Sequence, residues 1–414
     1  MRMEGKVTKQ NENVLGARKN RRSFFKNGMI AAGAAVGAGM LPGSLPAFDR
    51  EDDDRAPITK GDIAILTFLQ ALEQVEADLW IQYSELGGIQ DNEVSGVNGG
   101  NAAYMTALQI LDGDMPQYIH DNTDDEISHA AFLAKYLESK GASPVSLEPF
   151  RVLPTSKATG ANQNFKKDGG RLTNLMQLQV DTSFWTRYRS ITNPDFDLKA
   201  TFAQATGNAD GSNSLVSGGR FTAIPRSDDD TAGSDANNTA DRLKAIAFTA
   251  GFHFAFIEQG GTSLYPTLAQ KVTNAEVLRI LLSIGPSETM HFQTWQDKAG
   301  NATPLTFTDP VNGSTVVFFD LHGAQGESQD EITNAGKVLQ ANLIMPEPTH
   351  FLDANAFPPV AIIRPTSTKN GGAVASVVSF VEDGLFLDAK GNNTGIVPVL
   401  MRLAEEADEA RRRF

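Results

Sequence analysis

The stretch DMPQYIHDNTDDEISHAAFLAKYLESKG, residues 114–141, decides the fold because it reads as one long helix with polar groups on its apolar side. Asp114 is a good N-cap residue, Pro116 suits a first turn, and Gly141 favours an end. Its apolar positions recur at helical spacing. The same stripe also carries a carboxylate and an imidazole, and its members are Met115, Ile119, Asn122, Glu126, His129, Leu133 and Tyr136.

A Glu-x-x-His pair occurs here as Glu126-Ile-Ser-His129 and again as Glu288-Thr-Met-His291. At this spacing on a helix, both side chains project from one face and can hold one metal ion. Mixed oxygen and nitrogen ligands suit iron or manganese, and also zinc. The second pair lies in a helix predicted over residues 274–298, which Gly285-Pro286 should kink or restart.

Two further glutamates lie on apolar helical stripes. Glu76 follows Leu69 and Leu72 in a helix predicted over residues 62–84, and Glu258 follows Phe254 in one predicted over 242–259, with its end near Gly260-Gly261. A buried carboxylate must be paired, protonated or bound to a cation, since burying it alone is too costly. Four such glutamates on four helices therefore indicate a shared cation site.

Three of these glutamates can be interpreted in a second way. Glu73 is one helical step from Glu76 and could be the ligand in its place, although Glu76 lies better on the stripe. Glu126 could instead close a capping box that starts at Thr123, and Glu258 could mark a polar helix end. The segment Glu347–His350 has the same Glu-x-x-His spacing, but its prolines predict irregular structure, so we interpret it as chance.

The stretch Glu76–Tyr83 resembles the first helix of bacterioferritin-like and rubrerythrin-like proteins, and residues 126–141 resemble their second helix. Leu72–Glu76 and Phe256–Tyr265 are similar to a branch of exported ferritin-like proteins that includes plant desiccation-related proteins. The resemblance covers roughly residues 60–140 and 242–300, and it implies a mainly α fold, a ferritin-like four-helix bundle around a dimetal site.

In such bundles two helices give one Glu each and the other two give Glu-x-x-His. The resemblance therefore implies two iron or manganese ions and a ligand set of Glu76, Glu126, His129, Glu258, Glu288 and His291. Such a centre would carry out oxygen or peroxide chemistry. The alternative is a non-catalytic stress- or desiccation-associated envelope protein with a structural or vestigial metal site, since a fold does not fix a function.

Two regions depart from the resemblance. Residues 142–241, between the second and third helices, form a long insertion within a bundle domain at 48–300. Residues 301–414 form a C-terminal region of mixed or β character. Short strands are predicted there at Ser314–Leu321, Val360–Ile363 and Ala375–Phe380, because these segments are β-branched and bounded by Gly, Pro or Asn. The resemblance does not extend to this region, and the sequence indicates no partner for it.

Residues 1–47 read as a leader. Arg21-Arg22 precedes an Ala/Gly-rich run over residues 28–41, which is typical of a twin-arginine signal peptide and predicts a folded protein exported to the periplasm or the medium. The alternative is a basic disordered tail. A stable membrane anchor is not expected, because the run is shorter than the roughly 20 apolar residues that cross a bilayer.

Charge and composition exclude other classes. The 414-residue chain has a formal net charge of −14, of which residues 1–47 contribute +6 and the rest −20. The acidic remainder of the chain repels the phosphate backbone of nucleic acids, and we therefore expect no nucleic-acid partner. The absence of cysteine excludes disulfides and thiolate sites. The sequence leaves a homo-oligomer open.

Overall fold

The computed structural model describes residues 57–91, 93–94, 97, 99–162, 170–182, 216–217, 220–231, 239–319 and 372–411. The expected leader at 1–47 and the chance motif at Glu347–His350 lie outside these residues. The predicted strand at Val360–Ile363 lies outside them as well.

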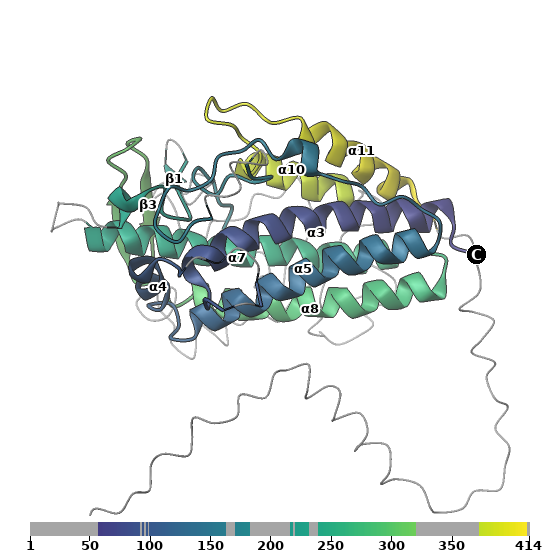
Figure 1. The fold of residues 1–414 in the computed structure, drawn as a ribbon, viewed down its shortest axis with the longest axis horizontal. Coiled ribbons are helices and arrows are strands. Elements are labelled where there is room, and N and C mark those ends of the chain that lie inside the picture. Colours follow the sequence, from purple (N-terminus) through teal and green to yellow (C-terminus); the bar gives the residue numbers. More distant parts are fainter. Residues whose placement is uncertain are drawn as a thin grey trace, which may run out of the picture. The chain divides into compact units, whose positions relative to one another are not determined.

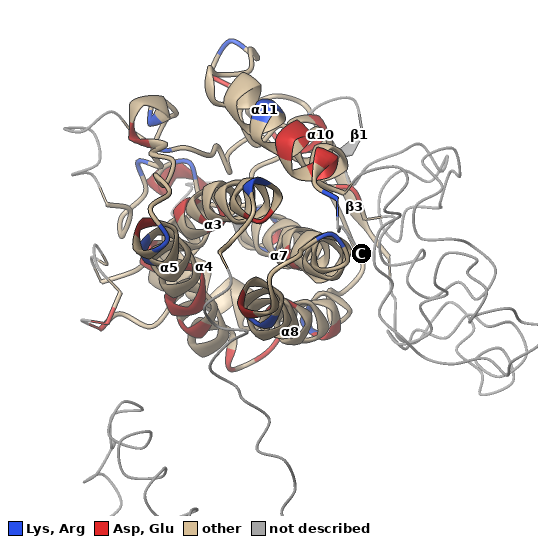
Figure 2. Cartoon of the chain, turned by 90° about the vertical axis from the view of Figure 1, so that its right-hand side faces the viewer, with Lys and Arg blue, Asp and Glu red and all other residues tan. Residues whose placement is uncertain are grey.

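Four long helices form the bundle: α3 (Lys60–Gly87), α5 (Met115–Ser139), α7 (Thr239–Ala269) and α8 (Ala275–Ala299). The main pairings are α3 with α5 and α7 with α8 (Figure 1). Seen along their length, the four helices surround a common interior (Figure 2). The mainly helical architecture and the four-helix bundle predicted from the sequence are confirmed.

Local sequence explains where these helices begin. Thr59 and Asp62 form a capping box at the start of α3, and Asn274 accepts the first backbone N–H groups of α8. α5 begins directly after Asp114 with Pro116 in its first turn, as predicted. Among the described residues, no helix combines the length and the apolar character needed to cross a membrane.

The predicted end of the third helix near Gly260-Gly261 is wrong, and the fourth helix does not restart at Gly285-Pro286. α7 continues past Gly260-Gly261 to Ala269, and α8 continues through Gly285-Pro286 without a break. The glycines' absent side chains allow close packing instead. A Cβ on Gly285 would lie 2.8 Å from Cβ of Tyr265 on α7, nearer than two carbon atoms can pack. At this point α7 and α8 can approach closely because α8 carries a glycine.

The described part of the insertion contains two 3-10 turns, η1 (Glu148–Phe150) and η3 (Asp228–Asp230). Other parts of it pack over α3. Gln70 and Gln74 of α3 hydrogen-bond the backbone of Val145. The buried carboxylate of Asp78 accepts the backbone N–H groups of Leu172 and Thr173. A short helix, α4 (Ala102–Leu108), contacts α3, α5 and α7. α3 therefore has partners on nearly all sides.

The C-terminal region is more helical than predicted. Strands β2 (Leu305–Thr308) and β3 (Thr315–Phe318) pair antiparallel, and β1 (Val216–Ser217) from the insertion completes a sheet of order β1-β3-β2. Helix α11 (Ile396–Glu409) packs on α3, and α10 (Ala373–Asp383) packs on α11 and α7.

The strand predicted at Ala375–Phe380 is wrong, because this segment belongs to α10. The carboxylate of Asp408 accepts the first backbone N–H groups of α10, from Gly372 to Val374, which stabilises a helix start. Val377 and Phe380, one turn apart, are both buried. Helical packing thus outweighs the β-propensity of the valines. The strand predicted at Ser314–Leu321 is confirmed for Thr315–Phe318.

Candidate metal centre

Two overlapping groups of acidic and histidine side chains lie inside the bundle, and each group takes its members from three of the four long helices. The first group is Glu73, Glu126, His129 and Glu288; the second is Glu126, Glu258, Glu288 and His291. In each group, one potential ligand atom from every residue lies within 4.8 Å of the others. Such groups have the size of a single ion's coordination sphere, so the interior offers two neighbouring cation positions.

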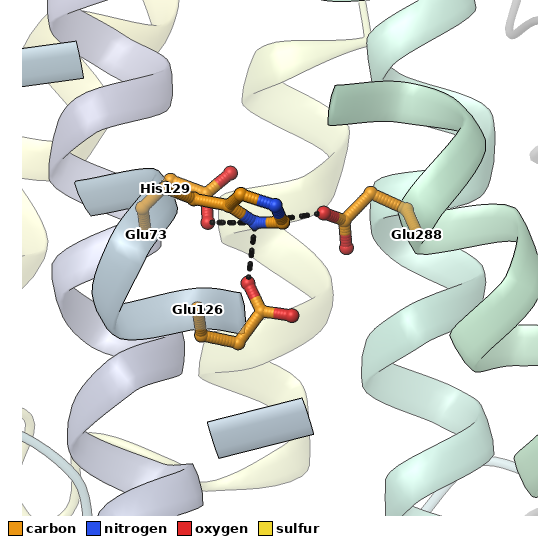
Figure 3. A group of neighbouring side chains, drawn as sticks. All are labelled: Glu73, Glu126, His129 and Glu288. Carbon is orange, nitrogen blue, oxygen red and sulfur yellow. Dashed lines mark hydrogen bonds and ion pairs between the residues drawn. The ribbon is translucent and has the colours of Figure 1, made fainter. Parts of the chain in front are cut away.

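The first group converges on the ring of His129 (Figure 3). Its Nδ1 atom lies 3.1 Å from Oε2 of Glu126, 3.3 Å from Oε1 of Glu288 and 3.4 Å from Oε2 of Glu73. Three carboxylates from three helices thus face one imidazole nitrogen. A proton on that nitrogen or a metal ion among these atoms would offset part of their negative charge.

The second group repeats this pattern around His291. Its Nδ1 atom lies 3.2 Å from Oε1 of Glu126 and 3.3 Å from Oε2 of Glu258. Glu126 therefore presents one oxygen to each histidine, and Glu288 belongs to both groups. These two carboxylates have the placement of bridging ligands, while Glu258 has that of a terminal one.

Both rings are oriented by groups on their outer side. Nε2 of His291 lies 3.1 Å from the carboxylate of Asp125, and Nε2 of His129 lies 3.3 Å from the hydroxyl of Ser287. A hydrogen bond at one ring nitrogen fixes which nitrogen points inward. Asp125 and Ser287 each stand directly before a glutamate of a Glu-x-x-His pair. No other feature of the sequence indicated that they would contact the histidines.

A buried amide links the two halves of the bundle. Nδ2 of Asn122 donates to Oε1 of Glu126 and to Oε1 of Glu258, each at 3.0 Å. The indole of Trp80 donates to the same Glu258 oxygen at 2.9 Å, and that of Trp295 donates to Oδ1 of Asn122 at 2.6 Å. Asn122 already stood out as a polar residue on the apolar stripe of its helix, which was the available signal.

This geometry favours Glu73, the alternative that the sequence left open, over Glu76 as a member of the centre. Glu73 belongs to the first group and Glu76 to neither. The phenol of Tyr265 donates to Oε1 of Glu73, so its other oxygen turns toward His129. The stripe misled because α3 is buried around most of its circumference, and an apolar face then does not indicate one direction. Glu76 is a further buried carboxylate beside the centre.

The bounds of α5 and α7 exclude the alternative interpretations of Glu126 and Glu258. Glu126 does not close a capping box, because α5 begins at Met115 and the hydroxyl of Thr123 bonds the carbonyl of Ile119 within the helix. Glu258 does not mark a helix end, since α7 continues to Ala269. The structure thus brings Glu126, His129, Glu258, Glu288 and His291 together as the sequence predicted.

Like charges in a dry interior shift the pKa values of these groups. Burial raises the pKa of Glu73 to about 7, and burial together with neighbouring glutamates raises the pKa of Glu76 and Glu288 well above the ordinary value. Burial likewise raises the pKa of Glu258. For Glu126, burial acts upward but is outweighed by His129 and His291, so its pKa falls.

Both imidazoles hold protons strongly when no metal is bound. Burial alone would lower their pKa values, but the surrounding carboxylates reverse this effect and raise them well above the ordinary value. The site thus carries excess negative charge. Protons compensate this charge at low pH, and metal ions would compensate it at higher pH.

Several buried atoms at the centre make no well-aligned hydrogen bond within the described residues, although the histidine and glutamate atoms lie at ion-pair distance from one another. They are Oε2 of Glu73, Oε2 of Glu258, both carboxylate oxygens of Glu288 and Nδ1 of His291. Buried polar atoms without partners are rare in folded proteins, so such a set calls for a bound group. Their chemistry is carboxylate oxygen and imidazole nitrogen without sulfur, which fits iron or manganese.

A model of the ferritin-like domain matches residues 61–301, more than half of the chain. The chain belongs to the ferritin-like domain family. No curated protein and no solved structure matches it. The matched range begins in α3 and ends just after α8, so in this ferritin-like protein it includes the whole insertion and all residues of both groups.

Exchange of the two α3 glutamates should separate their roles. We expect Glu73→Gln to lower the metal retained per chain, because the amide keeps the volume but loses an anionic ligand beside His129. The matched variant Glu76→Gln should retain metal like the wild type, since this side chain lies outside both groups. Metal analysis of both purified proteins is the measurement. Metal loss in Glu76→Gln alone would restore the sequence-based preference.

A second pair of variants tests the close approach of α7 to the centre. A Cβ on Gly261 would lie 2.8 Å from Oε2 and 3.1 Å from Cγ of Glu288, so Gly261→Ala should displace that carboxylate and destabilise the fold by about 1–3 kcal/mol. Gly260→Ala is the control, because its nearest neighbour is a Phe380 ring atom at 4.0 Å. We expect metal affinity to fall only in Gly261→Ala, and equal affinities would contradict the packing argument.

The pKa shifts also predict how metal removal affects stability. A carboxyl whose pKa is raised on folding stabilises the metal-free fold at low pH, and this stabilisation is lost as pH rises from about 4.5 through the folded pKa, about 7 for Glu73. The raised histidine pKa values act in the same direction above about 6.5. Calorimetry should therefore find that chelation lowers the melting temperature more at pH 7.5 than at pH 5.5. A pH-independent difference would argue against a charged apo centre.

Proposed function

We propose that the chain binds two iron or manganese ions and uses them for dioxygen or peroxide chemistry. The observation that carries the proposal is the sharing of Glu126 and Glu288 between two groups, each completed by one histidine and one further glutamate. This is the arrangement of ferritin-like dimetal proteins, with Glu73 and Glu258 as the terminal carboxylates.

The chain's own residues suit such chemistry. Two such ions would supply a place to bind dioxygen or peroxide and the electrons to reduce it. The carboxylates of both groups are almost fully buried, whereas each imidazole side chain is 12% exposed, so among these described residues the histidines lie nearest to solvent. A small oxidant can enter there, while bulk water is largely excluded. Asp125 and Ser287, at the outer ring nitrogens, are placed to keep the histidines aligned.

The second candidate function is that of a scaffold protein with a structural or vestigial site. Both functions use the same ligands, so metal binding alone does not separate them. A structural site would bind metal and raise stability without consuming an oxidant.

The reaction itself is the test. We expect the protein, loaded anaerobically with about two iron(II) ions per chain, to consume dioxygen or hydrogen peroxide with a change in its optical spectrum. The manganese(II) form is tested with hydrogen peroxide and an oxygen electrode. His291→Ala should abolish the reaction because it removes the imidazole of one group. His350→Ala, in the other Glu-x-x-His sequence, is the control. Two bound ions without any oxidant consumption would favour the scaffold.

We further propose that this protein is exported by the twin-arginine pathway. The supporting observation is Arg21-Arg22 before a short Ala/Gly-rich run. Replacing both arginines by Lys should leave the protein in the cytoplasm, because the pathway recognises the paired guanidinium groups. Cell fractionation measures this, with Lys19→Arg as a control. Normal export of the double variant would exclude the pathway.

A further inference from the structure

A third group of potential metal ligands lies where the segment after α3 meets the first turns of α5. It consists of Asp91, Glu93 and His120, whose ligand atoms lie within 4.8 Å of one another. His120 precedes Glu126 on α5 by six residues, which is about 9 Å along the helix axis and places the two side chains on different sides of α5. The third group shares no residue with the metal centre, and the proposed metal chemistry does not use it.

The imidazole of His120 is the buried member of this group. Its side chain is 4% exposed, whereas those of Asp91 and Glu93 are 40% and 58% exposed. Nε2 of His120 lies 3.1 Å from Oδ1 of Asp91 and 4.0 Å from Oε2 of Glu93. One nitrogen of a buried ring thus faces two carboxylates that reach solvent.

The other nitrogen of the same ring also faces a carboxylate. Nδ1 of His120 lies 3.5 Å from Oδ1 of Asp121, and within the described residues this buried atom makes no well-aligned hydrogen bond. An ionised carboxylate only accepts hydrogen bonds, whereas a neutral imidazole has a single N–H. A neutral ring must therefore point a lone pair at the carboxylates on one of its two sides, which is unfavourable without a cation between them.

A cation at Nε2 removes this conflict. With its proton on Nδ1, the ring of His120 can donate toward Asp121. The lone pair of Nε2 is then directed between Asp91 and Glu93, where an ion gains one nitrogen and two carboxylate oxygens as ligands. Metal-binding histidines usually donate their other ring N–H to a carboxylate, a carbonyl or water. The alternative is a doubly protonated ring in a purely structural ion-pair network, in which Nε2 carries a proton in place of a metal ion.

The backbone on either side of the two carboxylates is already held in place. The N–H of Ile89 donates to the carbonyl of Pro116 on α5 at 3.0 Å, and Val94 is 2% exposed. Between these two points, the N–H of Glu93 donates to Oδ1 of Asp91 at 2.9 Å, so both carboxylates keep their position relative to each other. An ion bound to His120 would add a direct link from these carboxylates to α5.

We propose that the third group is a mononuclear site for a divalent transition-metal ion such as zinc, which fastens the segment after α3 to α5. One nitrogen and two carboxylate oxygens suit zinc, which accepts three protein ligands with water in the fourth position. Calcium and magnesium favour oxygen ligands alone. Asp121 acts through His120 and is a positioning residue. The inference is independent of the proposed function, because it uses other residues and no redox chemistry.

Nitrogen-15 NMR of histidine side chains in the full chain tests the site directly, because the sequence has only six histidines. The protein is titrated with Zn²⁺, and His120→Gln identifies the signals of His120. We expect Nε2 of His120 to take the chemical shift of a metal-bound nitrogen while Nδ1 keeps its proton. His129 and His291 report the metal centre separately, so each site is measured whether or not the other binds. A ring of His120 that stays unchanged at saturating Zn²⁺ overturns the proposal.

Four variants test which side chains hold the ion. Asp91→Asn and Glu93→Gln change partly exposed residues, and each should weaken Zn²⁺ binding at His120 by at least about tenfold, because each loses an anionic ligand. Asp121→Asn should weaken it about ten- to a hundredfold, the usual loss for a residue that orients a ligand. Asp124→Asn is the matched control, since it removes the same charge from an exposed position of α5 outside the group. Equal weakening in the control would mean that only general electrostatics acts, and would overturn the site.

The Asp91→Asn variant also replaces His120→Gln if the latter does not fold. The histidine signal whose response to Zn²⁺ is lost in Asp91→Asn and kept in Asp124→Asn then belongs to the third group. If every histidine that responds to Zn²⁺ responds equally in both proteins, the proposal is wrong.

Hydrogen exchange tests the fastening role. Zn²⁺ should slow amide exchange at Ile89 and Glu93, roughly tenfold when free Zn²⁺ is about ten times its dissociation constant, because opening of the segment must release the ion. In Asp91→Asn the exchange should not respond, although Oδ1 of the new side chain can still accept the N–H of Glu93. Equal slowing in both proteins would originate from ions elsewhere in the chain and would contradict the fastening role.

Discussion

Five glutamate side chains lie close together in one buried interior. The repulsion between their negative charges is the constraint on which the structure depends. Carboxylates as close as Glu73, Glu126 and Glu288 cannot all carry charge in a low dielectric unless cations lie among them. Two imidazoles are placed where their protons, or metal ions in their stead, neutralise the group. The helix pairing, the hydrogen bonds of Asn122 and the glycines of α7 all serve to hold these charges at fixed distances.

The sequence predicted the bounds and site residues of a helix best where only one face of that helix is buried. α5 has one buried face, so its bounds, its polar stripe and both ligands could be predicted. α3 is buried around most of its surface, so its pattern did not distinguish Glu73 from Glu76. Gly260-Gly261 predicted a helix end because a glycine that lets a carboxylate approach looks the same in sequence as one that ends a helix.

The C-terminal region shows a different limit. The valines of α10 have the composition of a strand, and the residue that starts the helix, Asp408, lies far along the chain in α11. A local pattern could not reveal that contact. The described insertion has the same character, since the buried polar groups of α3 find their partners in it, for example Asp78 with Thr173. Such groups look like surface positions until the covering segment is known.

The long insertion has a consequence for how the candidate metal centre assembles. The centre takes ligands from both sides of it, and contacts such as that between Tyr265 and Glu73 join residues 192 positions apart. Neither half of the bundle holds a complete set of ligands, so no high-affinity site exists until the two halves have come together. Such non-local contacts form slowly during folding. In the proposed metal-bound protein, capture of the ions would therefore be a late event that requires the native topology.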